Sequence, residues 1–128
     1  MTSSDEKKFH GHIAKYEHNK DFIAHGIVDR SKFVDWELIA SFYAVIHLIE
    51  AVLVKEFGET PANHNDRKIA MLNHPNIFQD DVIFKYSKLS NYAHTARYHP
   101  WVGFPSNVAL DTQNCLEDID FCLKSYIP

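Results

Sequence analysis

The chain has 128 residues, a length typical of one domain with a single hydrophobic core. Its apolar fraction is 45% and its charged fraction 23%, ordinary values that exclude disordered and fibrous classes. The formal net charge is −4, whereas a protein that binds nucleic acid over a broad electrostatic surface is normally basic. Any nucleic-acid contact is therefore expected to be local. We expect a single domain over residues 1–128.

A first helix is predicted over residues 5–26. Ser3 and Glu6 have the spacing of a capping box, and residues 26–30 read as the turn that ends the helix. The polar segment before this helix lacks the apolar core of a signal peptide, which favours a cytoplasmic protein. The apolar residues that share one helical stripe are Phe9, Ile13, Tyr16, Ile23 and Ile27.

A second helix is predicted over residues 33–57, ending at Gly58. Residues 38–54 are apolar except for three polar side chains. This stretch is at the short limit for a membrane span and contains a carboxylate, so we expect a buried central helix and no transmembrane segment. The polar side chains are Ser41, His47 and Glu50.

A short helix is predicted over residues 63–72, followed by a third long helix over residues 78–98. The short helix ends before Pro75, because the residue before a proline avoids the helical region. The predicted core stripe of the third long helix is Phe78, Val82, Tyr86, Leu89, Ala93 and Ala96.

The last helix follows an apolar loop over residues 101–105, with Ser106 as the expected N-cap. Cys115 and Cys122 lie seven residues apart on this helix, about 10 Å along its axis at ~1.5 Å per residue. That separation is too long for a disulfide, so we expect both cysteines to be reduced and buried. The predicted core face is Val108, Thr112, Cys115, Leu116, Ile119, Cys122, Leu123 and Tyr126.

Four long helices with short connections predict an all-α fold, a four- to five-helix up-and-down bundle. The second helix is apolar nearly all round, and a bundle of this size offers few neighbours to cover it. The loop near Trp101 and Phe104 adds aromatic surface suited to an interface. We therefore expect a homodimer.

The polar residues of the second helix form the first candidate site. His47 and Glu50 share a face of an apolar helix, and a buried carboxylate is costly unless it is paired. His64 and Arg67, also at i and i+3, are the nearest candidate partners on the short helix. These residues form either a polar pocket that binds a ligand or a buried ion pair that fixes helix register.

No metal site or cofactor is predicted. The sequence has nine histidines, but His10 and His12 do not share a helix face, and no Glu-x-x-His motif or zinc-type ligand spacing occurs. Nucleophile-elbow and phosphate-loop motifs are absent as well.

The end of the third long helix is a second candidate site. Cations that alternate with aromatic residues are the local chemistry of RNA or nucleotide contacts, although cations also suit the negative end of a helix dipole. The residues concerned are Lys85, Tyr86, Lys88, Tyr92, His94, Arg97, Tyr98 and His99.

Three segments together resemble the higher eukaryote and prokaryote nucleotide-binding (HEPN) domains. Residues 41–51 resemble the central helix of that family. His64-Asn65-Asp66-Arg67 resembles its His-x-x-Arg, and residues 86–89 and 96–98 resemble its following helix. The resemblance covers roughly residues 36–99 and rests on the order and spacing of the pieces.

The resemblance implies a bundle, commonly dimeric, in a family that includes RNases of toxin–antitoxin and defence systems, partners of nucleotidyltransferases and non-catalytic binding modules. The RNases use an Arg-x(4–6)-His motif. Here the arginine falls at Ala93, while His99 remains near the place of the histidine. Alanine cannot stabilise phosphate charge.

We therefore expect a non-catalytic HEPN-like binding module for a nucleotide, an RNA or a partner protein such as a nucleotidyltransferase. The alternative is a metal-independent RNase that uses His99 with Arg97 or Arg67. The residues expected to bind a ligand or form a polar cluster are His47, Glu50, His64, Arg67, Arg97 and Tyr98.

Overall fold

The computed structural model describes residues 1–27, 29–99 and 101–127. Every regular element within these residues is helical, which confirms the predicted all-α bundle. The elements in chain order are α1 (Ser3–Asp21), the π-helical segment η1 (Phe22–Gly26), α2 (Val34–Phe57), α3 (His64–Leu72), α4 (Asp80–Tyr98), α5 (Ser106–Leu123) and the 3-10 turn η2 (Lys124–Tyr126).

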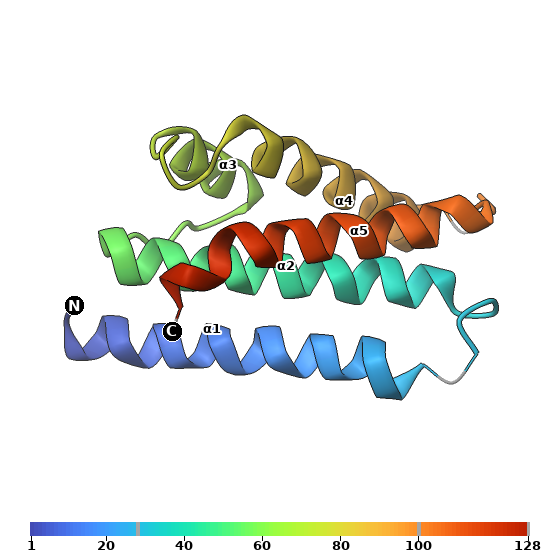
Figure 1. Cartoon of the computed structure of the whole chain (residues 1–128), viewed down its shortest axis with the longest axis horizontal. Helices are drawn as coiled ribbons and strands as arrows, with labels where there is room; N and C mark the ends of the chain where they lie inside the picture. The colour runs from blue at the N-terminus through green and yellow to red at the C-terminus, as the bar shows by residue number, and fades with distance from the viewer. Residues whose placement is uncertain (28, 100, 128) are drawn as a thin grey trace.

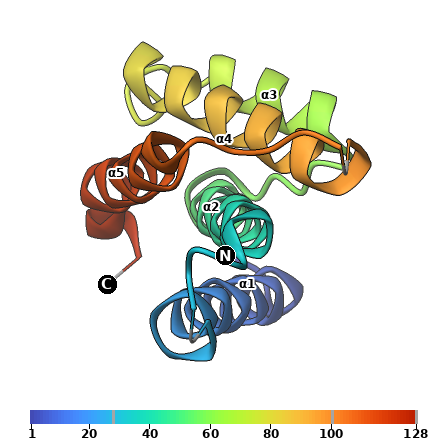
Figure 2. The same cartoon turned by 90° about the vertical axis from the view of Figure 1, so that its right-hand side faces the viewer.

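The four long helices alternate in direction, and α2 is the central one (Figures 1 and 2). Helix α1 packs along one side of α2, while α4 and α5 pack along the other. The short α3 belongs to the connection between α2 and α4, at the end of the bundle where α4 begins (Figure 1). One core therefore surrounds α2, as the up-and-down prediction requires.

Helix α1 begins at Ser3, so its N-cap lies one residue before the predicted cap. Thr2 is the N-cap, and its Oγ1 accepts a hydrogen bond of 3.0 Å from the backbone N–H of Asp5. Ser3 is already helical, so it cannot cap. At Phe22 the α-helix continues into the π-helical segment. The stripe residues Phe9, Tyr16, Ile23 and Ile27 are buried as predicted, and Ile13 is half-buried.

Helix α2 ends as predicted, because Gly58 adopts the left-handed backbone that terminates a helix. Its φ is +66°, and its N–H donates to Val54 O at 3.0 Å. By length and composition α2 is apolar enough to cross a membrane, but 72% of its most apolar stretch is buried inside the protein. This is the property expected of a central core helix.

Helix α3 starts one residue later than predicted, with Asn63 as its N-cap, and α4 starts two residues later than predicted. Asn63 Oδ1 accepts a 2.8 Å hydrogen bond from the N–H of Asp66, which satisfies one free donor of the first turn. Helix α4 starts at Asp80, and Phe78 before it is fully buried. The predicted stripe of α4 is buried except for Ala96, which is half-buried.

Two predictions for α5 are wrong. Ser106 is the first helical residue, and Pro105 occupies the N-cap position with an extended backbone. Cys122 is exposed, whereas Cys115 is buried as expected, and both thiols are free. The reason is that the last turns of α5 face the core with Ile119 and Leu123, which are fully buried, and Cys122 lies beside that stripe.

A buried carboxylate, Glu37, binds the connection between α1 and α2. Sequence reasoning did not single out this residue. Glu37 is fully buried, and its Oε1 lies 2.8 Å from Arg30 Nη1. Gln113 of α5 donates to the same oxygen at 3.1 Å. A buried charge needs such partners, so Glu37 joins the connection, α2 and α5 at one end of the bundle.

Candidate functional site

The predicted polar residues of α2 and α3 meet inside the bundle. Glu50 Oε1 accepts hydrogen bonds from Arg67 Nε at 3.0 Å and from Arg67 Nη2 at 2.9 Å. The exposed fractions of the two side chains are 13% and 10%. Of the two partners proposed for Glu50, the structure thus selects Arg67. A charge-assisted pair in this setting is strong because little water competes with it.

The remaining donors of Arg67 lead toward α4. Arg67 Nη1 donates to the hydroxyl of Tyr86 at 3.2 Å, and that hydroxyl lies 2.7 Å from His64 Nδ1. The other nitrogen of His64 lies 3.4 Å from Ser90 Oγ. His64 therefore joins the polar cluster through Tyr86 and is exposed to solvent on its outer side.

The second carboxylate oxygen of Glu50, Oε2, faces α1. Glu50 Oε2 lies 3.4 Å from His12 Nε2, and His12 Nδ1 lies 3.0 Å from His47 Nδ1. Both imidazoles are half-buried. One continuous series of polar contacts, which we call the polar chain, thus consists of His47, His12, Glu50, Arg67, Tyr86, His64 and Ser90. Its members are joined by hydrogen bonds, except for the 3.4 Å contact between His12 and Glu50.

Sequence reasoning missed His12. It was compared only with His10, which is exposed on another face of α1. Its position relative to the apolar stripe was the available signal, because His12 lies three residues after Phe9 and four before Tyr16. Those spacings place it on the face of α1 that packs against α2.

Burial shifts the three histidines of the polar chain toward their neutral forms. Loss of hydration lowers the pKa of His12 and of His47, and the nearby Glu50 carboxylate opposes the effect. Burial also lowers the pKa of His64, and the positive charges of Arg67, Lys68 and Arg97 lower it further. His64 therefore lies in a locally positive field, although the whole chain is acidic.

Two predicted residues, Arg97 and Tyr98, meet Tyr43 of α2, which sequence reasoning did not single out as a site residue. These three residues form what we call the Tyr–Arg surface. Arg97 Nη1 donates to the Tyr43 hydroxyl at 2.8 Å. The guanidinium carbon lies 5.7 Å from the centre of the Tyr43 ring and 5.3 Å from that of Tyr98. The rings are 37% and 60% exposed, so a cation held by two aromatic faces is accessible to a ligand.

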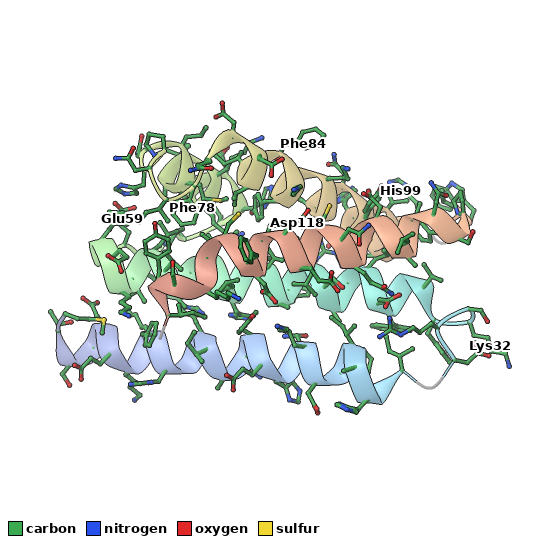
Figure 3. All side chains as sticks on the ribbon, viewed as in Figure 1. Lys32, Glu59, Phe78, Phe84, His99 and Asp118 are labelled. Carbon is green, nitrogen blue, oxygen red and sulfur yellow. The ribbon has the colours of Figure 1, made fainter. Side chains whose placement is uncertain are left out.

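His99 has different neighbours from Arg97. Its ring centre lies 5.7 Å from that of His94 and 5.1 Å from that of Trp101. It also lines a cavity with Lys32 of the α1–α2 connection, at the end of the bundle where both residues lie (Figure 3). Among the described residues, no hydrogen bond joins His99 to Arg97.

Ala93, where the resemblance expects a catalytic arginine, belongs to the core. It is fully buried and packs in the cluster that surrounds α2. The Cβ of Ala93 faces the interior, so apolar side chains surround this position.

Glu50→Ala is expected to lower the free energy of unfolding by about 2–4 kcal/mol, because it leaves the buried Arg67 guanidinium without its counter-ion. Chemical denaturation of the variant and the wild type measures the difference. Glu56→Ala on the exposed side of α2 is the matched control, with a change within about 0.5 kcal/mol. Equal costs for the two variants would contradict the assigned role of Glu50.

The pKa of His64 is expected to lie below 6.5, as followed by the NMR shifts of its imidazole protons during titration. Lys68→Ala and Arg97→Ala should each raise it, because each removes a nearby positive charge. Lys124→Ala, a charge on another helix end, should leave it unchanged. A His64 that titrates above 6.5 would contradict the positive field.

The lowered pKa of His64 also determines the direction in which pH changes the stability of the fold. The folded state resists protonation of His64 more than the unfolded state does, so unfolding becomes more favourable as protons are added. The contribution of neutral His64 to the free energy of unfolding is therefore present at neutral pH and is lost as the pH falls below 6.5.

No protein-family model matches the chain, and neither a curated protein nor a solved structure is significantly similar to it.

Proposed function

We propose that the chain is a non-catalytic HEPN-like binding module whose ligand is RNA or a nucleotide. The observation that carries the proposal is the Tyr–Arg surface, in which Arg97 lies within 5.7 Å of two exposed tyrosine rings. Aromatic faces stack on bases, and a guanidinium pairs with phosphate. Both groups needed for a nucleotide therefore occur side by side.

Further positive charge acts near His64 of the polar chain. Arg67, Lys68 and Arg97 each lower the pKa of that imidazole. Arg67 itself is fixed by Glu50 and Tyr86, and Tyr86 in turn contacts His64. A local positive field of this kind attracts an anion without requiring a basic protein.

The proposal is non-catalytic because the expected catalytic groups are not assembled. A buried alanine replaces the arginine, and His99 lies against Trp101 rather than beside Arg97. Loss of one preorganised electrostatic group costs about 10²–10³ in rate. A lone histidine supplies general acid–base help only.

A labelled single-stranded RNA oligonucleotide is expected to bind to the wild type, with its affinity measured by fluorescence anisotropy at fixed salt. Tyr98→Ala should weaken binding by about 5- to 150-fold, the effect of about 1–3 kcal/mol for loss of one base-stacking partner. Arg97→Ala should weaken binding and reduce its salt dependence. Phe121→Ala on α5 is the matched control, because Phe121 is also exposed and its ring centre lies 5.2 Å from Nζ of the cation Lys124.

Equal binding by all variants would show that the Tyr–Arg surface is not the site. No binding of RNA or mononucleotides by the wild type would favour a partner protein, such as a nucleotidyltransferase, as the ligand. The same RNA is expected to stay intact after incubation with chelated metal. Cleavage by the wild type that His99→Ala abolishes would replace the binding module by the RNase alternative.

We also propose that the protein forms a homodimer. Of the two reasons that the sequence offered, the apolar second helix and the aromatic loop, only the loop still supports a dimer. The apolar surface of α2 is covered inside one chain, so it does not require a partner. The loop after α4 still exposes aromatic surface, with Trp101 76% exposed. Large exposed aromatics are enriched in interfaces.

Sedimentation at micromolar concentration is expected to give roughly twice the chain mass of 14.8 kDa, as a closed two-fold pair requires. Trp101→Ser should shift the distribution toward the single chain. Phe84→Ser, which changes an aromatic residue that is 62% exposed on α4, serves as the control and should not. A wild type that sediments as a single chain would refute the dimer.

A cytoplasmic location is part of the proposal. Cys115 and Cys122 are both free, and the thiol of Cys122 is exposed. An exposed free thiol persists in a reducing compartment, whereas in an oxidising one it tends to form mixed disulfides.

A further inference from the structure

Three side chains at the α1–α2 interface bring metal-binding atoms together. His12 comes from α1, and His47 and Glu50 come from one face of α2. One ligand atom from each residue can be chosen so that all three lie within 4.8 Å of one another. Two imidazoles and a carboxylate form a ligand set that zinc proteins use, with a fourth position left for water or another ligand.

The distance between the two imidazoles is close to that of a zinc site. Two nitrogens bound to tetrahedral Zn²⁺ at ~2.0–2.1 Å are about 3.3 Å apart. His12 Nδ1 and His47 Nδ1 are 3.0 Å apart, so a small separation of the two rings would admit the ion. Such a shift is within the freedom of two half-buried side chains.

The carboxylate of Glu50 is oriented by the hydrogen bonds that its Oε1 accepts from Arg67. Arg67 binds Oε1 of Glu50 through two nitrogens, and Oε2 lies 3.4 Å from Nε2 of His12, whereas Nδ1 of His12 faces His47. The ion therefore requires the His12 ring to turn, so that one of its nitrogens faces both neighbours. Metal ligands are commonly held by a second set of hydrogen bonds, as Glu50 is by Arg67, and loss of that set weakens metal binding. Arg67 thus positions a ligand atom without touching the proposed ion.

We propose that His12, His47 and Glu50 form a binding site for Zn²⁺. The ion would join α1 to α2 at the middle of their contact, with its open coordination position at the partly exposed side of the cluster, where His12 is 21% exposed. Neutral imidazoles and a carboxylate suit Zn²⁺ better than the hard cations Mg²⁺ and Ca²⁺, which prefer oxygen ligands.

The competing explanation is that the three side chains form hydrogen bonds only. The distances allow His47, His12 and Glu50 to satisfy one another without an ion. The two explanations differ in how the protein responds to added metal, and this response decides between them. The zinc site lies on the α1 side of Arg67, and the proposed RNA surface lies on the α4 side, so neither test depends on the outcome of the other.

The test begins with protein dialysed against a chelator and then freed of it. Added Co²⁺, which replaces Zn²⁺ in such sites, should give the visible absorption of a tetrahedral complex, saturating at one equivalent per chain. Zn²⁺ should displace it, and calorimetry with Zn²⁺ alone should give the same stoichiometry. Zn²⁺ should also raise the midpoint of thermal unfolding, because it binds the folded state.

His12→Ala and His47→Ala are each expected to abolish the Co²⁺ absorption. Glu50→Gln should weaken binding at least about tenfold, the lower end of the loss seen when the surroundings of a metal ligand are altered. His10→Ala is the matched control, since His10 is exposed on the same helix two residues away. It should bind Co²⁺ as the wild type does. Circular dichroism verifies that each variant remains helical.

An absence of tetrahedral Co²⁺ absorption and of a thermal shift in the wild type would show that the cluster forms hydrogen bonds only. Binding that His10→Ala reduces as much as His12→Ala would show adventitious binding by surface histidines. If the His12 and His47 variants do not fold, NMR of the wild type decides. Zn²⁺ must then shift the imidazole signals of His12 and His47 and leave those of His10 unchanged, and any other pattern overturns the proposal.

Discussion

The ion pair between Glu50 and Arg67 is the interaction on which the interior of this bundle depends. Helix α2 is otherwise apolar over its central turns, so a carboxylate placed there must find a counter-charge from another helix. Helix α3 supplies it, although α3 has only nine residues and few contacts with the rest of the core. The short helix is thus positioned by charge as much as by its buried Ala70 and Met71.

From this pair, polar contacts extend in two directions through an otherwise apolar core. One direction passes through Tyr86 to His64 and reaches the surface of α3 and α4. The other passes through His12 to His47 between α1 and α2. Buried polar groups that satisfy one another specify a single arrangement of helices, because any slip of register leaves several of them unpaired.

Much of the fold could be predicted from the sequence, because its signals are local. The apolar period and Gly58 define α2 to within one residue, and Asn63 marks the start of α3. The pairing of Glu50 with Arg67 was also predictable, since a buried charge leaves few choices. His12 was not found because its partner His47 is 35 residues away, and such a contact follows from the packing of two helices. The hydroxyl of Tyr86 was missed for a related reason: helical periodicity marks a residue as buried without showing what its polar atom meets.

Arg67 also determines where the hydrogens lie on the Tyr86 side of the polar chain. A guanidinium only donates, so Tyr86 must accept from it and direct its own hydroxyl hydrogen to Nδ1 of His64. His64 is then the Nε2–H tautomer. A single permanent cation on α3 thus fixes the hydroxyl direction of a tyrosine on α4 and, through it, the tautomer of a histidine on its own helix.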